Sequence, residues 1–74
     1  NVFPNPKEKN QPLIIQTDHA DDYRLLVYNA KGSIVRAYSL NGDARLDDLN
    51  LAAGVYLWRI VTGEGQQSGR LLVE

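Results

Sequence analysis

The sequence predicts an all-β domain, a small antiparallel β-sandwich built from about seven short strands. Two observations favour this fold: apolar residues recur with the period of a strand, and turn sequences interrupt them roughly every 8–12 residues. The chain has 74 residues and no cysteine, so a core of aliphatic and aromatic side chains must stabilise it without disulfides. A chain of this length fits one domain, which we place at residues 1–74.

The clearest strand pattern is in the segment 55–61. Arg59 marks the face exposed to water, because burying an unpaired guanidinium costs much free energy. Tyr56, Trp58 and Ile60 occupy the alternate positions and are therefore expected in the core. The complete set of expected strands is Val2–Phe3, Leu13–Gln16, Tyr23–Tyr28, Ser33–Leu40, Ala44–Asp47, Val55–Thr62 and Ser68–Val73.

Turn sequences separate these strands at three places. The segment Asn29–Gly32 predicts a hairpin loop in which Gly32 adopts a positive φ. Asn41–Gly42 is a pair favoured in tight type I′ turns, and Gly63–Gly65 marks a third turn. Such short connections are typical of an antiparallel sandwich.

Two further segments lack a clear strand pattern. Lys7–Pro12 is polar and is expected to be a loop that carries the chain between the sheets. Asn50–Gly54 fits a single helical turn, capped by Asn50 and ended by Gly54, although it is too short for a full helix. Neither segment changes the predicted fold class.

Charge and hydropathy limit the classes of partner. Eight basic and nine acidic residues give a net charge of −1 at pH 7, with the two signs interspersed. No basic run is available for a phosphate backbone, so nucleic acid is not an expected partner. The longest apolar stretch, Leu51–Trp58, is far shorter than the ~20 residues of a membrane helix, and the N-terminus shows no signal-peptide pattern.

Residues suited to metal or acid–base chemistry are few. His19 is the single imidazole and lies beside three carboxylates, Asp18, Asp21 and Asp22, which form a weak candidate for a Ca²⁺ site. The calcium-loop pattern is absent, so a solvated turn is the favoured interpretation. The adjacent carboxylates of Asp47–Asp48 point to opposite faces of a strand and cannot flank one bond. We therefore expect no enzymatic activity and no cofactor.

The aromatic residues leave an alternative function open. The rings concerned are Tyr28, Tyr38, Tyr56 and Trp58. If exposed, they could stack on a sugar, as in a carbohydrate-binding or adhesion module. In a domain this small, large side chains at strand spacing are more often needed in the core. Exposure of the rings is therefore the property that separates the two interpretations.

Four short motifs follow one another along the chain. They are Phe3–Pro6 (FPNP), Val27–Val35 (VYNAKGSIV), Leu51–Tyr56 (LAAGVY) and Arg70–Val73 (RLLV). Each is common by itself, but the four in this order closely resemble the type A C-terminal sorting domain of the type IX (Por) secretion system. The resemblance spans essentially the whole chain.

The resemblance implies a seven-stranded immunoglobulin-like sandwich at the C-terminus of a larger precursor. In this family the N-terminally attached cargo crosses into the periplasm, and the outer-membrane type IX translocon and its carrier proteins then recognise the sorting domain. A sortase-like cysteine peptidase removes the domain, and the cargo is left at the cell surface or secreted. The chain begins at Asn1 instead of a methionine, which favours the tail of such a precursor.

The resemblance also carries the family's motif residues onto this chain. The last strand is the expected contact with the translocon, because a terminal strand can present an edge or side chains to a receptor. An open edge also leaves room for self-association. The family typically has a lysine where this chain has Arg70, and a basic or polar end where it has Glu74. The expected recognition residues are Pro4, Asn5, Pro6, Asn29, Gly32, Val35, Gly54, Tyr56, Arg70, Leu72 and Val73.

Overall fold

The structure is a computed structural model that describes residues 2–17 and 21–74. Its strands are β1 (Val2–Phe3), β2 (Leu13–Ile15), β3 (Asp22–Tyr28), β4 (Ile34–Asn41), β5 (Ala44–Leu46), β6 (Gly54–Thr62) and β7 (Gly65–Val73). These match the seven predicted strands, and the largest difference is that β7 begins at Gly65 instead of Ser68. Within the described residues there is no helix able to cross a membrane.

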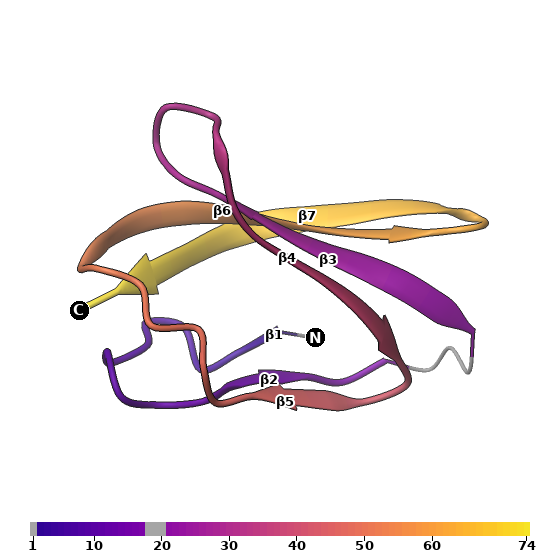
Figure 1. The fold of residues 1–74 in the computed structure, drawn as a ribbon, viewed down its shortest axis with the longest axis horizontal. Coiled ribbons are helices and arrows are strands. Elements are labelled where there is room, and N and C mark those ends of the chain that lie inside the picture. The colour runs from indigo at the N-terminus through magenta and orange to yellow at the C-terminus, as the bar shows by residue number, and fades with distance from the viewer. Residues whose placement is uncertain (1, 18–20) are drawn as a thin grey trace.

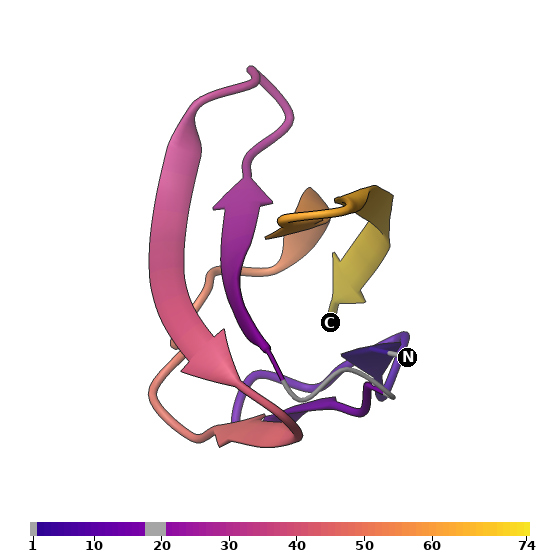
Figure 2. The same cartoon turned by 90° about the vertical axis from the view of Figure 1, so that its right-hand side faces the viewer.

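The strands form two antiparallel sheets that face each other, as Figure 1 shows. The smaller sheet has the order β1-β2-β5 and the larger one β4-β3-β6-β7. The view in Figure 2 looks along the layers and separates β4 from β7, which are the two edges of the larger sheet. This arrangement confirms the predicted all-β sandwich of the immunoglobulin-like class.

The core lies between the sheets and is formed by side chains at alternate strand positions. Tyr23, Leu25 and Val27 of β3 are buried, and Leu13 and Ile15 of β2 belong to the same apolar cluster. The other buried members of this cluster are Leu46, Leu49, Leu51, Ile60, Leu71 and Val73. Full burial of such a side chain stabilises the fold by about 1.5–3 kcal/mol, so this cluster can hold a chain without disulfides.

The two faces of β6 divide as predicted. Ile60 is buried, and Tyr56 and Trp58 are half-buried against the core. The opposite face is exposed and carries Val55, Leu57 and Arg59. Strand alternation together with the single arginine was therefore enough to orient this strand.

The side chain of Asn29 organises the turn between β3 and β4. Its Oδ1 accepts hydrogen bonds from the backbone N–H groups of Lys31 and Ser33, each at 3.0 Å. The N–H of Gly32 donates to the Asn29 carbonyl at 3.0 Å, and Gly32 has a φ of 88°. Glycine adopts this region without steric cost, so the predicted positive φ at Gly32 is confirmed.

The segment Asn50–Gly54 is not a helical turn, contrary to the prediction. It is irregular, and Asn50 has a φ of 50°. Leu49 and Leu51, which precede and follow Asn50, are both buried. Arg36 donates to the carbonyls of Leu49 at 2.9 Å and Asn50 at 3.2 Å, which satisfies oxygens that a helix would pair internally. Burial of both leucines requires an irregular crossing between the sheets in place of a helical cap.

The segment Lys7–Pro12 also differs from the prediction. It does not carry the chain from one sheet to the other, because β1 and β2 on either side of it pair with each other in the smaller sheet; Lys7 itself bonds to β7 of the larger sheet. Lys7 is fully buried instead of lying on a polar surface loop. Its Nζ donates to the carbonyls of Glu8 at 2.8 Å and Lys9 at 3.2 Å, which supply the partners that a buried ammonium requires.

Candidate functional site

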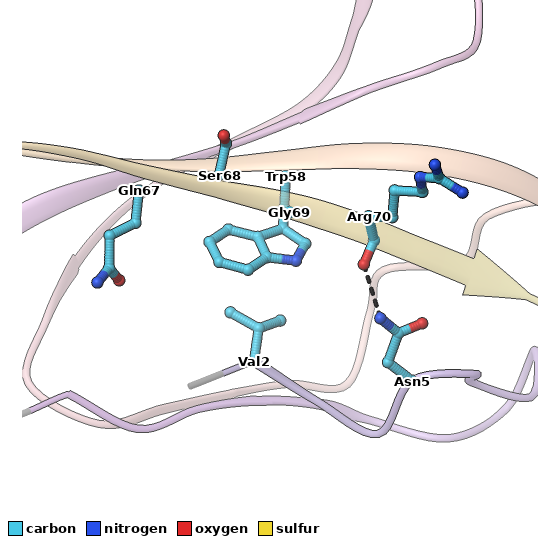
Figure 3. A pocket seen from close by; sticks show the side chains of 7 residues that line it. All are labelled: Val2, Asn5, Trp58, Gln67, Ser68, Gly69 and Arg70. Carbon is cyan, nitrogen blue, oxygen red and sulfur yellow. Dashed lines mark hydrogen bonds between the residues drawn. The ribbon is translucent and has the colours of Figure 1, made fainter.

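The N-terminal segment that contains Asn5 lies along the outer edge of β7, the last strand (Figure 3). Asn5 Nδ2 donates to the Arg70 carbonyl at 2.7 Å, and Asn5 Oδ1 accepts from the Leu72 N–H at 3.0 Å. The Lys7 N–H donates to the Leu72 carbonyl at 2.7 Å, and the Lys7 carbonyl accepts from the Glu74 N–H at 2.8 Å. The end of β7 is therefore bonded on both sides, by β6 and by this segment.

The residues next to Asn5 favour the contact between the N-terminal segment and β7. Pro4 and Pro6 flank Asn5, and their fixed φ values restrict the backbone that presents its side chain. Burial lowers the pKa of the Lys7 ammonium below its ordinary value, because desolvation disfavours the charged form. Within the described residues no carboxylate forms a salt bridge with Lys7, so carbonyl oxygens hold its Nζ. The junction between the entry segment and β7 thus combines exposed and buried contacts.

The Gly54–Tyr56 motif begins β6 with a tyrosine corner. Tyr56 Oη donates to the Ala52 carbonyl, four residues upstream, at 2.7 Å. This is the bond by which immunoglobulin-like sandwiches tie a strand to the crossing that precedes it. Gly54 is the first residue of β6, and the ring of Tyr56 is half-buried against the core. The contacts of the motif are therefore structural ones that hold the entry into β6.

A groove of about 500 Å³ lies beside the last strand, and its lining residues come from β1, β6, β7 and the entry segment (Figure 3). They are Val2, Asn5, Trp58, Gln67, Ser68, Gly69 and Arg70. The Trp58 ring packs directly against Gly69: a Cβ at that position would lie 2.7 Å from Trp58 Cζ2. Sequence reasoning missed Gly69, although a glycine inside a strand is a known signal of close approach.

The aromatic rings do not form the exposed platform on which a sugar could stack. Tyr38, Tyr56 and Trp58 are half-buried and pack against the core. Tyr28 is half-buried on the outer face, where the Arg59 guanidinium lies 5.4 Å from the centre of its ring. The carbohydrate-binding alternative therefore gains no support from the placement of these rings.

The predicted recognition residues differ in exposure. Arg70 is exposed on β7, and Leu72 is 40% exposed. Val73 is buried and Val35 is half-buried against the core, so their side chains are structural. The turn Asn29–Gly32 lies at the same end of the larger sheet as the start of β6 and the end of β7 (Figure 1). The fold thus brings together motifs that are far apart in the sequence.

The predicted metal candidate is only partly described. Asp18 and His19 lie outside the described residues. Asp22 Oδ1 accepts a hydrogen bond from Asn41 Nδ2 at 2.8 Å, and Asp21 is exposed. In residues 2–17 and 21–74 no three histidine, cysteine or acidic side chains are grouped so that they could hold a metal ion.

The fold and the edge contacts define the class of protein: a small sandwich without disulfides, in which an N-terminal segment closes the end of the last strand. The family model described as "Secretion system C-terminal sorting domain" matches residues 1–74, the whole chain. The chain therefore belongs to this family of type IX secretion sorting domains, and the predicted resemblance is confirmed. No curated protein and no solved structure matches the chain.

Membership of the family defines the general function. The chain is a C-terminal sorting signal for type IX secretion. Such a signal implies interaction with the secretion machinery and with an attached cargo, and export toward the cell surface or secretion. Sorting domains of this family are generally non-catalytic.

Proposed function

We propose that this chain is a non-catalytic address that carries an N-terminally attached cargo through the outer-membrane type IX translocon. Carrier proteins of the system bind the folded domain in the periplasm, and a sortase-like cysteine peptidase then removes it. The cargo is left at the cell surface or is secreted. The observation that carries this proposal is the match of the family model over residues 1–74.

The folded surface around the last strand is the part that the translocon reads in this proposal. Support comes from the bonds on both sides of the strand end, which hold β7 in one conformation before any receptor binds. A preformed surface loses less conformational entropy on binding than a free peptide does. The exposed side chains of Arg70 and Leu72 are available for contact, whereas the buried Val73 keeps the strand in place.

A reporter fusion tests the proposed function. The 74-residue chain is placed at the C-terminus of a fluorescent protein that carries a signal peptide, in a type IX-competent host and in a translocon-deficient strain. We expect the reporter at the surface or in the medium of the first host and in the periplasm of the second. Retention in the periplasm of both hosts would contradict the proposal.

A second pair of variants separates recognition from folding. Deletion of the segment 70–74 should abolish export, but it also removes the pairing of β7 with β6 and with Asn5. Arg70→Ala is cleaner, because Asn5 bonds to the Arg70 backbone carbonyl and not to its guanidinium. We expect Arg70→Ala to reduce export while the matched change Arg45→Ala, on the smaller sheet, leaves it unchanged. Full export of Arg70→Ala would exclude its charge as a recognition element.

A further inference from the structure

The outer face of the larger sheet carries an unusual share of exposed apolar side chains. Among the described residues, the exposed large hydrophobics are Phe3, Ile34, Val55, Leu57 and Leu72. Phe3 belongs to β1 in the smaller sheet, but the other four belong to β4, β6 and β7. An antiparallel sheet that packs one face on the core usually turns polar side chains to water on the other. This outer face therefore departs from the usual pattern.

The strand register makes these side chains neighbours. Val55 lies opposite Leu72, Leu57 lies opposite Tyr28, and Tyr28 lies opposite Ile34. Residues directly opposite each other in antiparallel strands point to the same face. Because Val27 points into the core, Tyr28 and its partners point outward. We call Ile34, Tyr28, Leu57, Val55 and Leu72 the apolar band; it crosses all four strands of the sheet.

The exposure of the band is large enough to require an explanation. Ile34, Val55 and Leu57 are each exposed by half or slightly more. Single exposed hydrophobics are common on protein surfaces, whereas a contiguous group marks an interaction site. In the strand register the band lies toward the end of the sheet that carries the β3–β4 turn, the start of β6 and the end of β7, which Figure 1 shows at one end of the sheet. These are the places where three of the family motifs occur.

The charged side chains beside the apolar band on this face are basic. Arg59 and Arg70 are exposed there, with Arg70 opposite Leu57 in the register, and Arg24 is exposed further along β3. Within the described residues no salt bridge involves these three arginines. The acidic residues around this face are Asp22 at the far end of β3, Glu64 in the turn between β6 and β7, and Glu74 after the end of β7, and none of them lies opposite a band residue in the register. The face is therefore locally basic although the chain has a net charge of −1.

We propose that the apolar band and its arginines dock an acidic partner protein of the secretion machinery, whose surface presents apolar side chains bordered by Asp or Glu. The proposal rests on the proposed sorting function. Complementary charge steers such a pair together and selects it against others. A second copy of the chain fits poorly, because a two-fold contact on this face would bring arginines toward arginines. A lipid surface fits less well, because even the four most exposed band side chains keep only 40–55% of their surface open and so have little apolar area to insert.

The test uses the reporter fusion with two kinds of variant. Val55→Thr combined with Leu57→Thr removes apolar surface while placing threonine, a β-branched residue that favours strands, at both positions. Phe3→Thr is its control, because Phe3 is also exposed but lies on the other sheet. Arg59→Glu reverses a charge beside the band, and Arg45→Glu is its control on the smaller sheet. We expect both band variants to lose about tenfold or more of the exported reporter, the cost typical of interface hot spots, and both controls to export normally.

The outcomes distinguish this inference from the function on which it rests. If the unaltered domain fails to export, the sorting function is wrong and this inference falls with it. If the unaltered domain exports and both band variants export equally well, only the docking surface is wrong. Thermal unfolding of each isolated variant shows whether it still folds. If the Val55→Thr/Leu57→Thr variant is unfolded, the export of Arg59→Glu decides whether the docking surface is correct. Two other results would overturn the proposal. One is a dimer of the unaltered chain that the band variants abolish. The other is flotation of the unaltered chain with anionic vesicles that the band variants abolish.

Discussion

Asn5 is the residue through which the entry segment holds the last strand, and its replacement by alanine is the most direct test of that contact. The change removes the donor to the Arg70 carbonyl and the acceptor for the Leu72 N–H, at 2.7 and 3.0 Å. It leaves the backbone bonds of Lys7 to β7 in place. The experiment therefore measures the side-chain contact and not the whole junction.

The expected magnitude follows from two exposed hydrogen bonds. A typical intramolecular hydrogen bond contributes a net 0.5–1.5 kcal/mol, roughly, because water replaces it in the unfolded chain. Both bonds of Asn5 lie near the surface, so water also reaches the two backbone groups that alanine leaves unpaired. We expect a loss of about 1–2 kcal/mol in the free energy of unfolding. In a domain of this size that lowers Tm by about 4–16 °C.

Trp58 provides the assay, because it is the only tryptophan and lines the same groove as Asn5. Urea unfolding of the chain, followed by its fluorescence, gives the free energy of unfolding for each variant. Asn10→Ala, at an exposed loop position, is the matched control. If Asn5→Ala and Asn10→Ala differ by less than about 0.3 kcal/mol, the two bonds do not hold the last strand and the reasoning fails.

Three further predictions concern packing, the tyrosine corner and pH. Gly69→Ala should destabilise the domain by about 1–3 kcal/mol in the same assay, because its Cβ would meet the Trp58 ring at 2.7 Å. Tyr56→Phe should cost about 0.5–1.5 kcal/mol, since it removes the bond to the carbonyl four residues upstream. Burial, and then the charge of Asp43, raise the pKa of Tyr23, so the folded state keeps a proton that the unfolded state releases above about pH 10. The stability advantage of the unaltered chain over Tyr23→Phe should therefore shrink as pH rises from about 9 to 11.

Each of these predictions has a result that would refute it. Gly63→Ala adds the same methyl group in open space and should stay within about 0.5 kcal/mol of the unaltered chain; an equal loss would reject the steric argument. A stability of Tyr56→Phe equal to that of the unaltered chain would show that the corner bond contributes nothing. A cost of Tyr23→Phe that is the same at pH 9 and pH 11 would contradict the raised pKa. Chemical denaturation measures all three changes.

Several parts of the fold were predictable because they depend on neighbouring positions only. The inward direction of Tyr56, Trp58 and Ile60 follows from alternation and one arginine. The positive φ of Gly32 follows from a four-residue turn whose bonds are all local. The order of the four motifs was likewise enough to predict the family.

The errors and omissions have a common physical cause. Lys7 was expected in a polar loop, but carbonyl oxygens and the last strand bury it. Asn50 was expected to cap a helical turn, but the core takes up the leucines on both of its sides. Gly69 gave only a weak signal, because its role depends on a tryptophan ring from another strand. In each case the free energy of a distant contact outweighed the local preference.

The amino-acid sequence alone therefore determined the strands, most of the turns and the class of sorting domain, since side-chain alternation and turn chemistry act over a few residues. Only the tertiary structure decided which strands became edges and what covers them. Asn5 reaches Arg70 across 65 positions of sequence, and no local pattern specifies that pairing. The apolar band likewise exists only because the register places residues of four strands side by side. Such surfaces form only when the strands pair into the sheets, so a receptor can recognise them only in the folded domain.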